Sequence, residues 1–249
     1  MNISFLTTED PVYLPEFFRR VLEPLGRHAL KVYSVPPLYR KQSSLQAAVR
    51  YRRTFGTVAA AHLTCRVLLA KVRGQSIAAE CARCEVSYEL VPDVNAPEFL
   101  AQLRAEAPDI LISVSCPQIF KKPLIELPRR GILNIHGAIL PHYRGVMPSF
   151  WMLANGEKQA GVSIYWVNEA IDAGDRCGLR VFPIEPTDTL DSFIRRSKAL
   201  AANLLIEVVA QVAAGTGPRE PLDLSGGSYF SWPDAAAVRR FRAAGRRIW

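Results

Sequence analysis

Short apolar runs alternate with segments of helical periodicity along most of the chain. Runs with the length of buried strands occupy residues 3–6, 29–35, 85–90, 109–114 and 131–136, and two further strands are predicted at 161–167 and 179–184. Between them the spacing predicts helices over 15–23, 96–106, 122–127, 149–155 and 187–214. The last of these has Thr187 or Asp188 as its expected N-cap. This alternation is typical of a doubly wound, mostly parallel α/β sheet.

Two segments stand apart from the alternating pattern. Residues 38–76 are basic and read as helical, most clearly at 58–72. Residues 215–228 are rich in Gly, Pro, Ser and acidic side chains, which is typical of a linker or an extended tail. The pattern of residues 233–249 predicts a basic amphipathic helix. We therefore expect a main domain over 1–214 that carries an insertion at about 38–76, followed by a short C-terminal extension, 215–249.

Composition narrows the class of protein. Hydrophobic residues make up 49% of the chain, enough for a full core, but no run reaches the length of a membrane span. The first ten residues read as a strand and not as a signal peptide, and the five cysteines fit a reduced, cytoplasmic protein. The Cys81–Cys84 pair lacks the second pair that a structural zinc site needs, so we expect no metal.

The formal charge of +8 indicates an anionic partner, without choosing among a phosphorylated metabolite, a nucleotide sugar and RNA. Much of the excess lies in two arginine-rich stretches, 39–53 and 239–247. The chain contains neither the Gly-x-Gly-x-x-Gly pattern nor the Walker A pattern, so the usual loops that bind dinucleotides and triphosphates are missing.

Asn134 and His136 interrupt an otherwise apolar strand, and because side chains alternate they point to the same face. Burying an amide and an imidazole together is costly unless they are used. A downstream loop supplies Asp172, a carboxylate able to orient the imidazole and favour its charged form. Such a set suits acyl transfer through an oxyanion. No nucleophile elbow is present, which favours direct transfer between two bound substrates.

The motifs Asn134-Ile-His136, Leu140-Pro-His-Tyr-Arg-Gly145, Gly161-Val-Ser-Ile164 and Ile171-Asp-Ala-Gly-Asp175 occur in this order. Together they resemble the folate-dependent formyltransferase family, which includes glycinamide ribonucleotide, methionyl-tRNA and amino-sugar enzymes. The resemblance covers roughly 1–35 and 80–210. It implies a Rossmann-like catalytic domain that takes a formyl group from 10-formyltetrahydrofolate.

The resemblance also assigns roles to residues. Asn134, His136 and Asp172 fall on the family's catalytic positions, and Arg144 and Tyr143 become candidates for binding the substrate. Many members have a histidine where this chain has Tyr165. The segments that would hold the folate contain six residues: Gln118, Ile119, Phe120, Ile125, Asn168 and Ile171.

Several functions remain open at this point. The leading one is transfer of the formyl group to a primary amine on an anionic small molecule, such as a nucleotide-linked amino sugar. A methionyl-tRNA formyltransferase and a hydrolase of the formyl donor are the enzymatic alternatives. An RNA- or partner-binding protein that retains the fold is the non-enzymatic one. The sequence leaves the acceptor amine, the role of 38–76 and the oligomeric state open.

Overall fold

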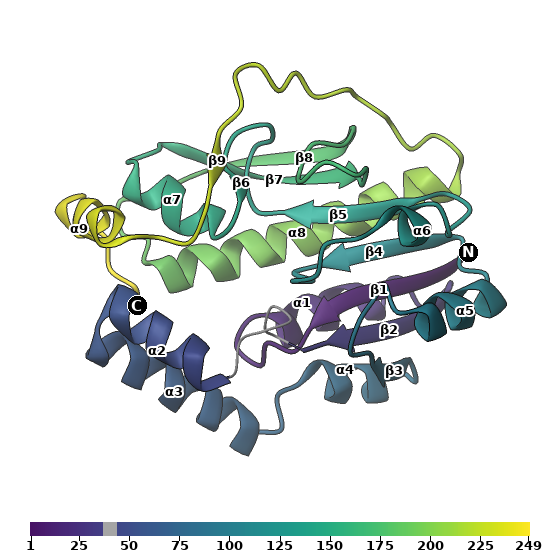
Figure 1. Cartoon of the computed structure of the whole chain (residues 1–249), viewed down its shortest axis with the longest axis horizontal. Coiled ribbons are helices and arrows are strands. Elements are labelled where there is room, and N and C mark those ends of the chain that lie inside the picture. The colour runs from purple at the N-terminus through teal and green to yellow at the C-terminus, as the bar shows by residue number, and fades with distance from the viewer. Residues whose placement is uncertain (37–43) are drawn as a thin grey trace.

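A seven-stranded sheet forms the centre of the computed structural model, which describes residues 1–36 and 44–249 (Figure 1). The strand order is β3-β2-β1-β4-β5-β7-β8. The first five of these strands run parallel, whereas β7 is antiparallel to β5 and to β8. The predicted mostly parallel, doubly wound sheet is confirmed. The strands are β1 (Asn2–Thr8), β2 (Ala29–Val35), β3 (Ser87–Leu90), β4 (Ile110–Val114), β5 (Ile132–His136), β7 (Gln159–Trp166) and β8 (Arg176–Pro183).

Helices cover both faces of the sheet because its strands are apolar on both sides. In β1, Ile3 and Phe5 join one core cluster and Leu6 joins the other. The larger cluster takes in α1 (Leu14–Leu22), α4 (Ile77–Arg83), α7 (Pro148–Ala154) and α8 (Leu190–Ala213). The smaller one takes in α5 (Pro97–Glu106) and α6 (Lys122–Ile125). In the part of the chain that the structure describes, no helix is long and apolar enough to cross a membrane.

The basic segment forms two helices, α2 (Ser44–Phe55) and α3 (Thr57–Val72), which lie together at the periphery (Figure 1). Residues 37–43, where the predicted insertion begins, lie outside the described residues. The C-terminal extension packs on these helices. Trp232 contacts Phe55 edge to face and donates a hydrogen bond to Thr54, and Trp249 stacks on His62. Helices α2 and α3 and the C-terminal extension therefore support each other.

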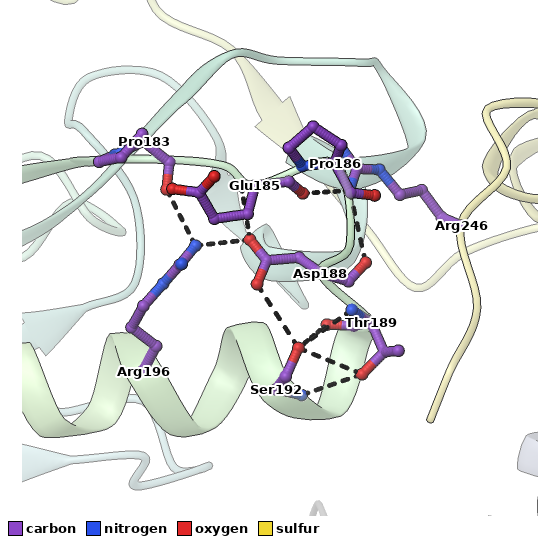
Figure 2. Close-up of polar contacts among 8 residues, drawn as sticks. All are labelled: Pro183, Glu185, Pro186, Asp188, Thr189, Ser192, Arg196 and Arg246. Atoms are coloured by element: carbon purple, nitrogen blue, oxygen red, sulfur yellow. Dashed lines mark hydrogen bonds and ion pairs between the residues drawn. The ribbon is translucent and has the colours of Figure 1, made fainter.

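The extension also closes over the start of α8, as Figure 2 shows. The guanidinium of Arg246 donates to the carbonyl oxygens of Glu185, Pro186 and Asp188, the first at 2.7 Å. Asp188 in turn accepts from Arg196 of α8 at 2.5 Å. These bonds hold the segment after α9 (Ala235–Ala243) against the loop between β8 and α8.

Several predicted boundaries were wrong. Helix α8 begins at Leu190, and its N-cap is Thr189, whose side chain accepts from Ser192 N in a capping box; Thr187 and Asp188 lie before it. The predicted helix over 233–249 is shorter, 235–243, because Gly245 takes a positive φ that ends it. Helix α4 was not predicted, although Ser76 caps it in the usual way. Strand β8 begins at Arg176, before its predicted start.

Candidate active site

Asn134 and His136 occupy the carboxyl end of β5, where open α/β sheets bind ligands. β5 is the strand at which the sheet changes direction, with parallel β4 on one side and antiparallel β7 on the other. The register places Asn134 between Ser113 of β4 and Tyr165 of β7. The two polar side chains of β5 thus face a site bordered by three strands.

Tyr165 joins two of the predicted catalytic residues. Its hydroxyl donates to Asp172 Oδ1 at 2.7 Å and accepts from Asn134 Nδ2 at 3.0 Å. Burial, and then the Asp172 carboxylate, raise the pKa of Tyr165 well above its usual value of 10. The phenol therefore keeps its proton and acts as a fixed donor to the carboxylate. The amide of Asn134 retains a second N–H that this bridge does not use.

Asp172 is held from the opposite side by main chain. Its Oδ2 accepts from Gly145 N at 2.8 Å, and the residue takes a left-handed φ of 49° in the loop between β7 and β8. Gly145 has a φ of 95°, and a Cβ there would lie 2.2 Å from the carbonyl oxygen of Phe230. Only glycine fits at 145, so the donor to Asp172 depends on this backbone.

A main-chain carbonyl, and not the Asp172 carboxylate, makes the hydrogen bond that orients His136. Its Nε2 lies 2.8 Å from the carbonyl oxygen of Tyr143, an acceptor only, so Nε2 carries a hydrogen. Its Nδ1 lies 3.8 Å from Asp172 Oδ2, longer than a hydrogen bond. The expected orientation by Asp172 is thus supplied here by Tyr143, and Nδ1 remains free to act toward a ligand.

Two cavities meet at this constellation. The first, about 310 Å³ and here named the loop cavity, is lined by the 116–120 and 167–172 segments. The second, about 460 Å³ and here named the helix cavity, extends from His136 to α7 and α8. Asn134, Gly145 and Asp172 line both. Two different molecules bound in these cavities would have their nearest ends beside Asn134 and Asp172.

The sequence of this same region identifies the family. Residues 66–209, more than half of the chain, match the formyl transferase family model. The chain belongs to the formyl transferase family. The resemblance stated from the sequence is thereby confirmed.

Curated relatives of this chain include the methionyl-tRNA formyltransferase of Geobacter metallireducens. The two are 37% identical over 130 residues, which cover 52% of this chain and 42% of the relative. A methionyl-tRNA formyltransferase of Koribacter versatilis is 40% identical over 121 residues, 49% of this chain and 39% of that protein. The alignments thus span less than half the length of these relatives.

Solved structures share the fold of this chain over nearly its whole length. A sugar N-formyltransferase from a Shewanella species superposes with a TM-score of 0.63 at 16% identity, covering 98% of this chain and 87% of that one. An N-formyltransferase from Helicobacter canadensis, solved with folinic acid and dTDP-3-aminofucose, gives 0.61 at 15%, covering 98% and 80%. At these identities the likeness shows the fold alone.

The residues that the sequence resemblance assigns to folate binding gather, with one exception, around the loop cavity. The side chains of Ile119 and Ile171 are 65% and 46% exposed there, a large apolar area for residues of their type. Ile125 does not line this cavity and instead borders a shallow hollow beside Asn168. The lining residues from the assigned set are Gln118, Ile119, Phe120, Asn168 and Ile171.

Two of these side chains shape the cavity and have their polar atoms occupied. Gln118 donates to the carbonyl oxygen of Pro92 and accepts from Val94 N, both at 2.8 Å. Asn168 accepts from Ala170 N at 3.0 Å, which folds the loop before Asp172. These amides therefore fix the loops that surround a ligand.

The two residues assigned to substrate binding line neither cavity. The hydroxyl of Tyr143 donates to Glu157 at 2.5 Å, and its ring stacks on Phe230. Arg144 lies in β6 (Arg144–Gly145), and its buried Nε has no hydrogen-bond partner within the described residues. The Tyr143 side chain thus holds the loop that carries Gly145 against Glu157 and Phe230.

Sequence reasoning missed the polar wall of the helix cavity. Lys198, in the middle of α8, donates to Ser115 Oγ at 2.7 Å, and Asp10 lines the same cavity. Burial lowers the pKa of Lys198, and burial raises the pKa of Asp10. No local motif marks either residue, and Lys198 follows two other basic residues, Arg195 and Arg196, so the sequence does not single it out.

Cys116 lines both cavities, and burial raises the pKa of its thiol to about 11. At neutral pH the thiol is therefore protonated, which fits a wall residue better than a nucleophile. Tyr229 of β9 (Tyr229–Phe230) also lines the loop cavity, so the C-terminal extension contributes to the site. In 1–36 and 44–249, no group of three or more His, Cys, Asp or Glu could hold a metal ion.

Proposed function

We propose that this chain transfers a formyl group from 10-formyltetrahydrofolate to a primary amine. The observation that carries the proposal is the shared wall of the two cavities. Asn134 and Asp172 line both, so a donor in one and an acceptor in the other would meet beside them. Direct transfer needs such an arrangement, because no covalent intermediate on the protein would carry the group from one site to the other.

The loop cavity suits the folate. It offers exposed apolar side chains, Ile119 and Ile171, beside main-chain groups of two loops, which fits a flat ring system with polar edges. The fold neighbour from Helicobacter canadensis was solved with folinic acid, which supports a folate ligand for this fold. Asn134 lies at the inner end of this cavity, where the formyl group would sit.

The residues then have separate roles in one displacement. The amine nitrogen forms a bond to the formyl carbon, and the bond from that carbon to the folate nitrogen breaks. The unused N–H of Asn134 stabilises negative charge on the formyl oxygen. The imidazolium form of His136, which carries a second hydrogen on Nδ1, donates to the same oxygen. Asp172, fixed by Tyr165 and Gly145, takes the proton that the amine loses and passes it, through water, to the departing nitrogen.

The helix cavity suits an acceptor with an anionic group. Lys198 lines it, and Tyr13 at its border is flanked by Arg66 and Arg195, whose guanidinium carbons lie 5.6 Å and 5.5 Å from the ring centre. A phosphate entering from this side would favour the charged form of Lys198. We therefore favour a nucleotide-linked amino sugar, the class of compound with which the Helicobacter canadensis neighbour was solved.

Methionyl-tRNA is the second candidate acceptor. The sequence identity to methionyl-tRNA formyltransferases, 37% over 130 residues for that of Geobacter metallireducens, favours it. Exposed arginines on α2, among them Arg50 and Arg52, would suit a phosphate backbone. The two candidates differ in the acceptor and share the same transfer chemistry.

The test is a tetrahydrofolate-release assay with 10-formyltetrahydrofolate and a panel of nucleotide-linked amino sugars, ribonucleotide amines and methionyl-tRNA. Release that requires both donor and one acceptor supports the proposal, and formylated product identifies the acceptor. Asp172→Asn and His136→Ala should each lower kcat by about a hundredfold or more. Release of formate without any amine would instead indicate a hydrolase, and unchanged turnover in both variants would refute the assigned site.

A further inference from the structure

A third cavity adjoins the loop between β1 and α1. Its volume is about 310 Å³, and its walls come from that loop, from α1, from the second half of α3 and from α8. Glu16 is the one acidic residue that lines it in the described chain, and it pairs with Arg19 at 3.4 Å. We name this cavity the arginine pocket after four of its lining residues: Arg19, Arg66, Arg73 and Arg195.

The positive charge of the arginine pocket is only partly neutralised by the protein. Asp191 of α8 pairs with both Arg66, at 2.5 Å, and Arg195, at 3.1 Å. Arg73 forms no ion pair with any residue in 1–36 or 44–249. Three guanidinium groups thus share one carboxylate, which leaves two positive charges. The buried Nη2 of Arg66 also has no hydrogen-bond partner among the residues that the structure describes.

The arginine pocket adjoins the helix cavity at Tyr13. Tyr13 lines the helix cavity, and the two guanidinium groups that contact its ring, those of Arg66 and Arg195, line the arginine pocket. The helix cavity also reaches Asp172 in the candidate active site. A molecule with one end beside Asp172 could therefore pass Tyr13 and bring its other end to the arginines.

We propose that the arginine pocket binds the diphosphate of a nucleotide-linked acceptor, while the amino sugar of that acceptor occupies the helix cavity. The amine would then lie at the Asp172 end of the helix cavity and the anionic groups at the Tyr13 end. This inference rests on the proposed function, because it places the charged part of the acceptor that the active site would formylate.

A diphosphate fits the arginine pocket in charge and in size. The planar guanidinium group donates two parallel hydrogen bonds to phosphate oxygens, a geometry that lysine lacks. The two positive charges left over by Asp191 match an anion of at least two negative charges. The volume is at the lower limit of about 300–1,000 Å³ for small-molecule sites, so the nucleoside would extend beyond the pocket.

The first experiment measures binding by isothermal titration calorimetry and needs no turnover. The probes are dTDP, inorganic diphosphate and thymidine. The parent protein should bind dTDP and inorganic diphosphate, and should bind thymidine at least about tenfold more weakly than dTDP. Arg73→Ala and Arg195→Gln should each weaken dTDP binding about tenfold, because each removes a charged donor. The Arg195→Gln variant leaves Asp191 with its partner Arg66.

The matched control for the loss of one charge is Arg104→Ala. Arg104 is an exposed arginine of α5, which packs on the other face of the sheet from α1 and α8, so this variant should bind dTDP as the parent does. Circular dichroism checks that all three variants are folded. Equal affinity of the parent for dTDP and thymidine, or dTDP binding that neither Arg73→Ala nor Arg195→Gln weakens, would overturn the proposal. An equal loss in Arg104→Ala would overturn it as well.

The second experiment distinguishes the diphosphate of the acceptor from a separate anion. It follows tetrahydrofolate release with the acceptor that the panel identifies. dTDP should compete with this acceptor, and Arg73→Ala should raise the KM for the acceptor about tenfold without raising the KM for 10-formyltetrahydrofolate. Inhibition by dTDP that is not competitive with the acceptor, or an acceptor that contains no diphosphate, would overturn the assignment. If no amine gives release, the proposed function fails, and calorimetry still decides whether the pocket binds a diphosphate.

Discussion

Replacing Tyr165 with phenylalanine would remove one hydroxyl from the candidate site and leave the ring in place. The ring is 4% exposed and lies opposite Asn134 in the sheet, so its packing should survive. The hydroxyl, however, is the only group that contacts both Asn134 and Asp172 among the described hydrogen bonds. Its loss leaves Asp172 Oδ1 without a donor and lets the Asn134 amide turn.

The size of the effect follows from the two bonds. A hydrogen bond to a carboxylate contributes about 1.5–3 kcal/mol, and the bond from Tyr165 to Asp172 is 2.7 Å long at a carboxylate that is 13% exposed. If the whole loss is felt in the transition state, kcat/KM falls by about tenfold to about 150-fold. Because the bridge positions groups and binds no substrate, the loss should fall on kcat.

Steady-state tetrahydrofolate release measures this change, and thermal unfolding measures the accompanying loss of stability. Tyr33→Phe is a matched control, since Tyr33 is also buried and donates to the carboxylate of Glu106, far from β5. It should lose comparable stability and keep its turnover. A Tyr165→Phe enzyme with kcat/KM within twofold of the parent would refute the bridging role. An equal loss of activity in Tyr33→Phe would trace the effect to stability.

Three further predictions concern other parts of the structure. Gly145→Ala would bring a Cβ within 2.2 Å of the Phe230 carbonyl oxygen, so it should separate β6 from β9 and lower kcat/KM about tenfold or more. Glu80 is partly buried, which raises its pKa, but hydrogen bonds from Arg19 and a second arginine lower it below 4.5 overall. The unfolded chain therefore binds a proton at Glu80 more readily than the folded chain does. The ionised Glu80 carboxylate stabilises the folded state above about pH 4.5, and this stabilisation is lost as the pH falls through the folded pKa of Glu80. Urea midpoints measured against pH should accordingly fall less steeply below that pH in Glu80→Gln. Arg246→Ala should cost about 1–2 kcal/mol in chemical denaturation with turnover retained, and hydrogen exchange should rise at the start of α8 if its contacts hold the tail there.

The strands were predictable because their signal is local. Residues 29–35 form β2 with the predicted bounds, since an apolar run of that length specifies a buried strand without reference to distant residues. The two-residue strands β6 and β9 carry no such signal. They exist because Arg144 meets Tyr229, a pairing of segments far apart in the sequence. The helix-end errors have a different, local origin, since Gly245 and the capping box at Thr189 compete with equally plausible neighbouring residues.

In the candidate site, too, the residues that belong to local motifs were predictable, and those that depend on the packing of distant segments were not. Asn134, His136 and Asp172 carry recognisable motifs, and the structure brings them together. The bridge by Tyr165 depends on the antiparallel register between β5 and β7, which the sequence does not state. Lys198 lies in a helix whose pattern says only which face is buried, so its place in the helix cavity required the packing of α8 on the sheet.

A single molecule that joined a pterin-like head to an amine mimic would have to pass beside Asn134 and Asp172, which line both the loop cavity and the helix cavity. The two cavities, about 310 Å³ and about 460 Å³, share that wall, so a linker of only a few atoms would span them. Once the head was bound, the second group would sit at an effective concentration in the millimolar range, about the value that short flexible linkers give. The affinities of such bisubstrate compounds, varied at the amine end alone, would measure the acceptor selectivity of the helix cavity.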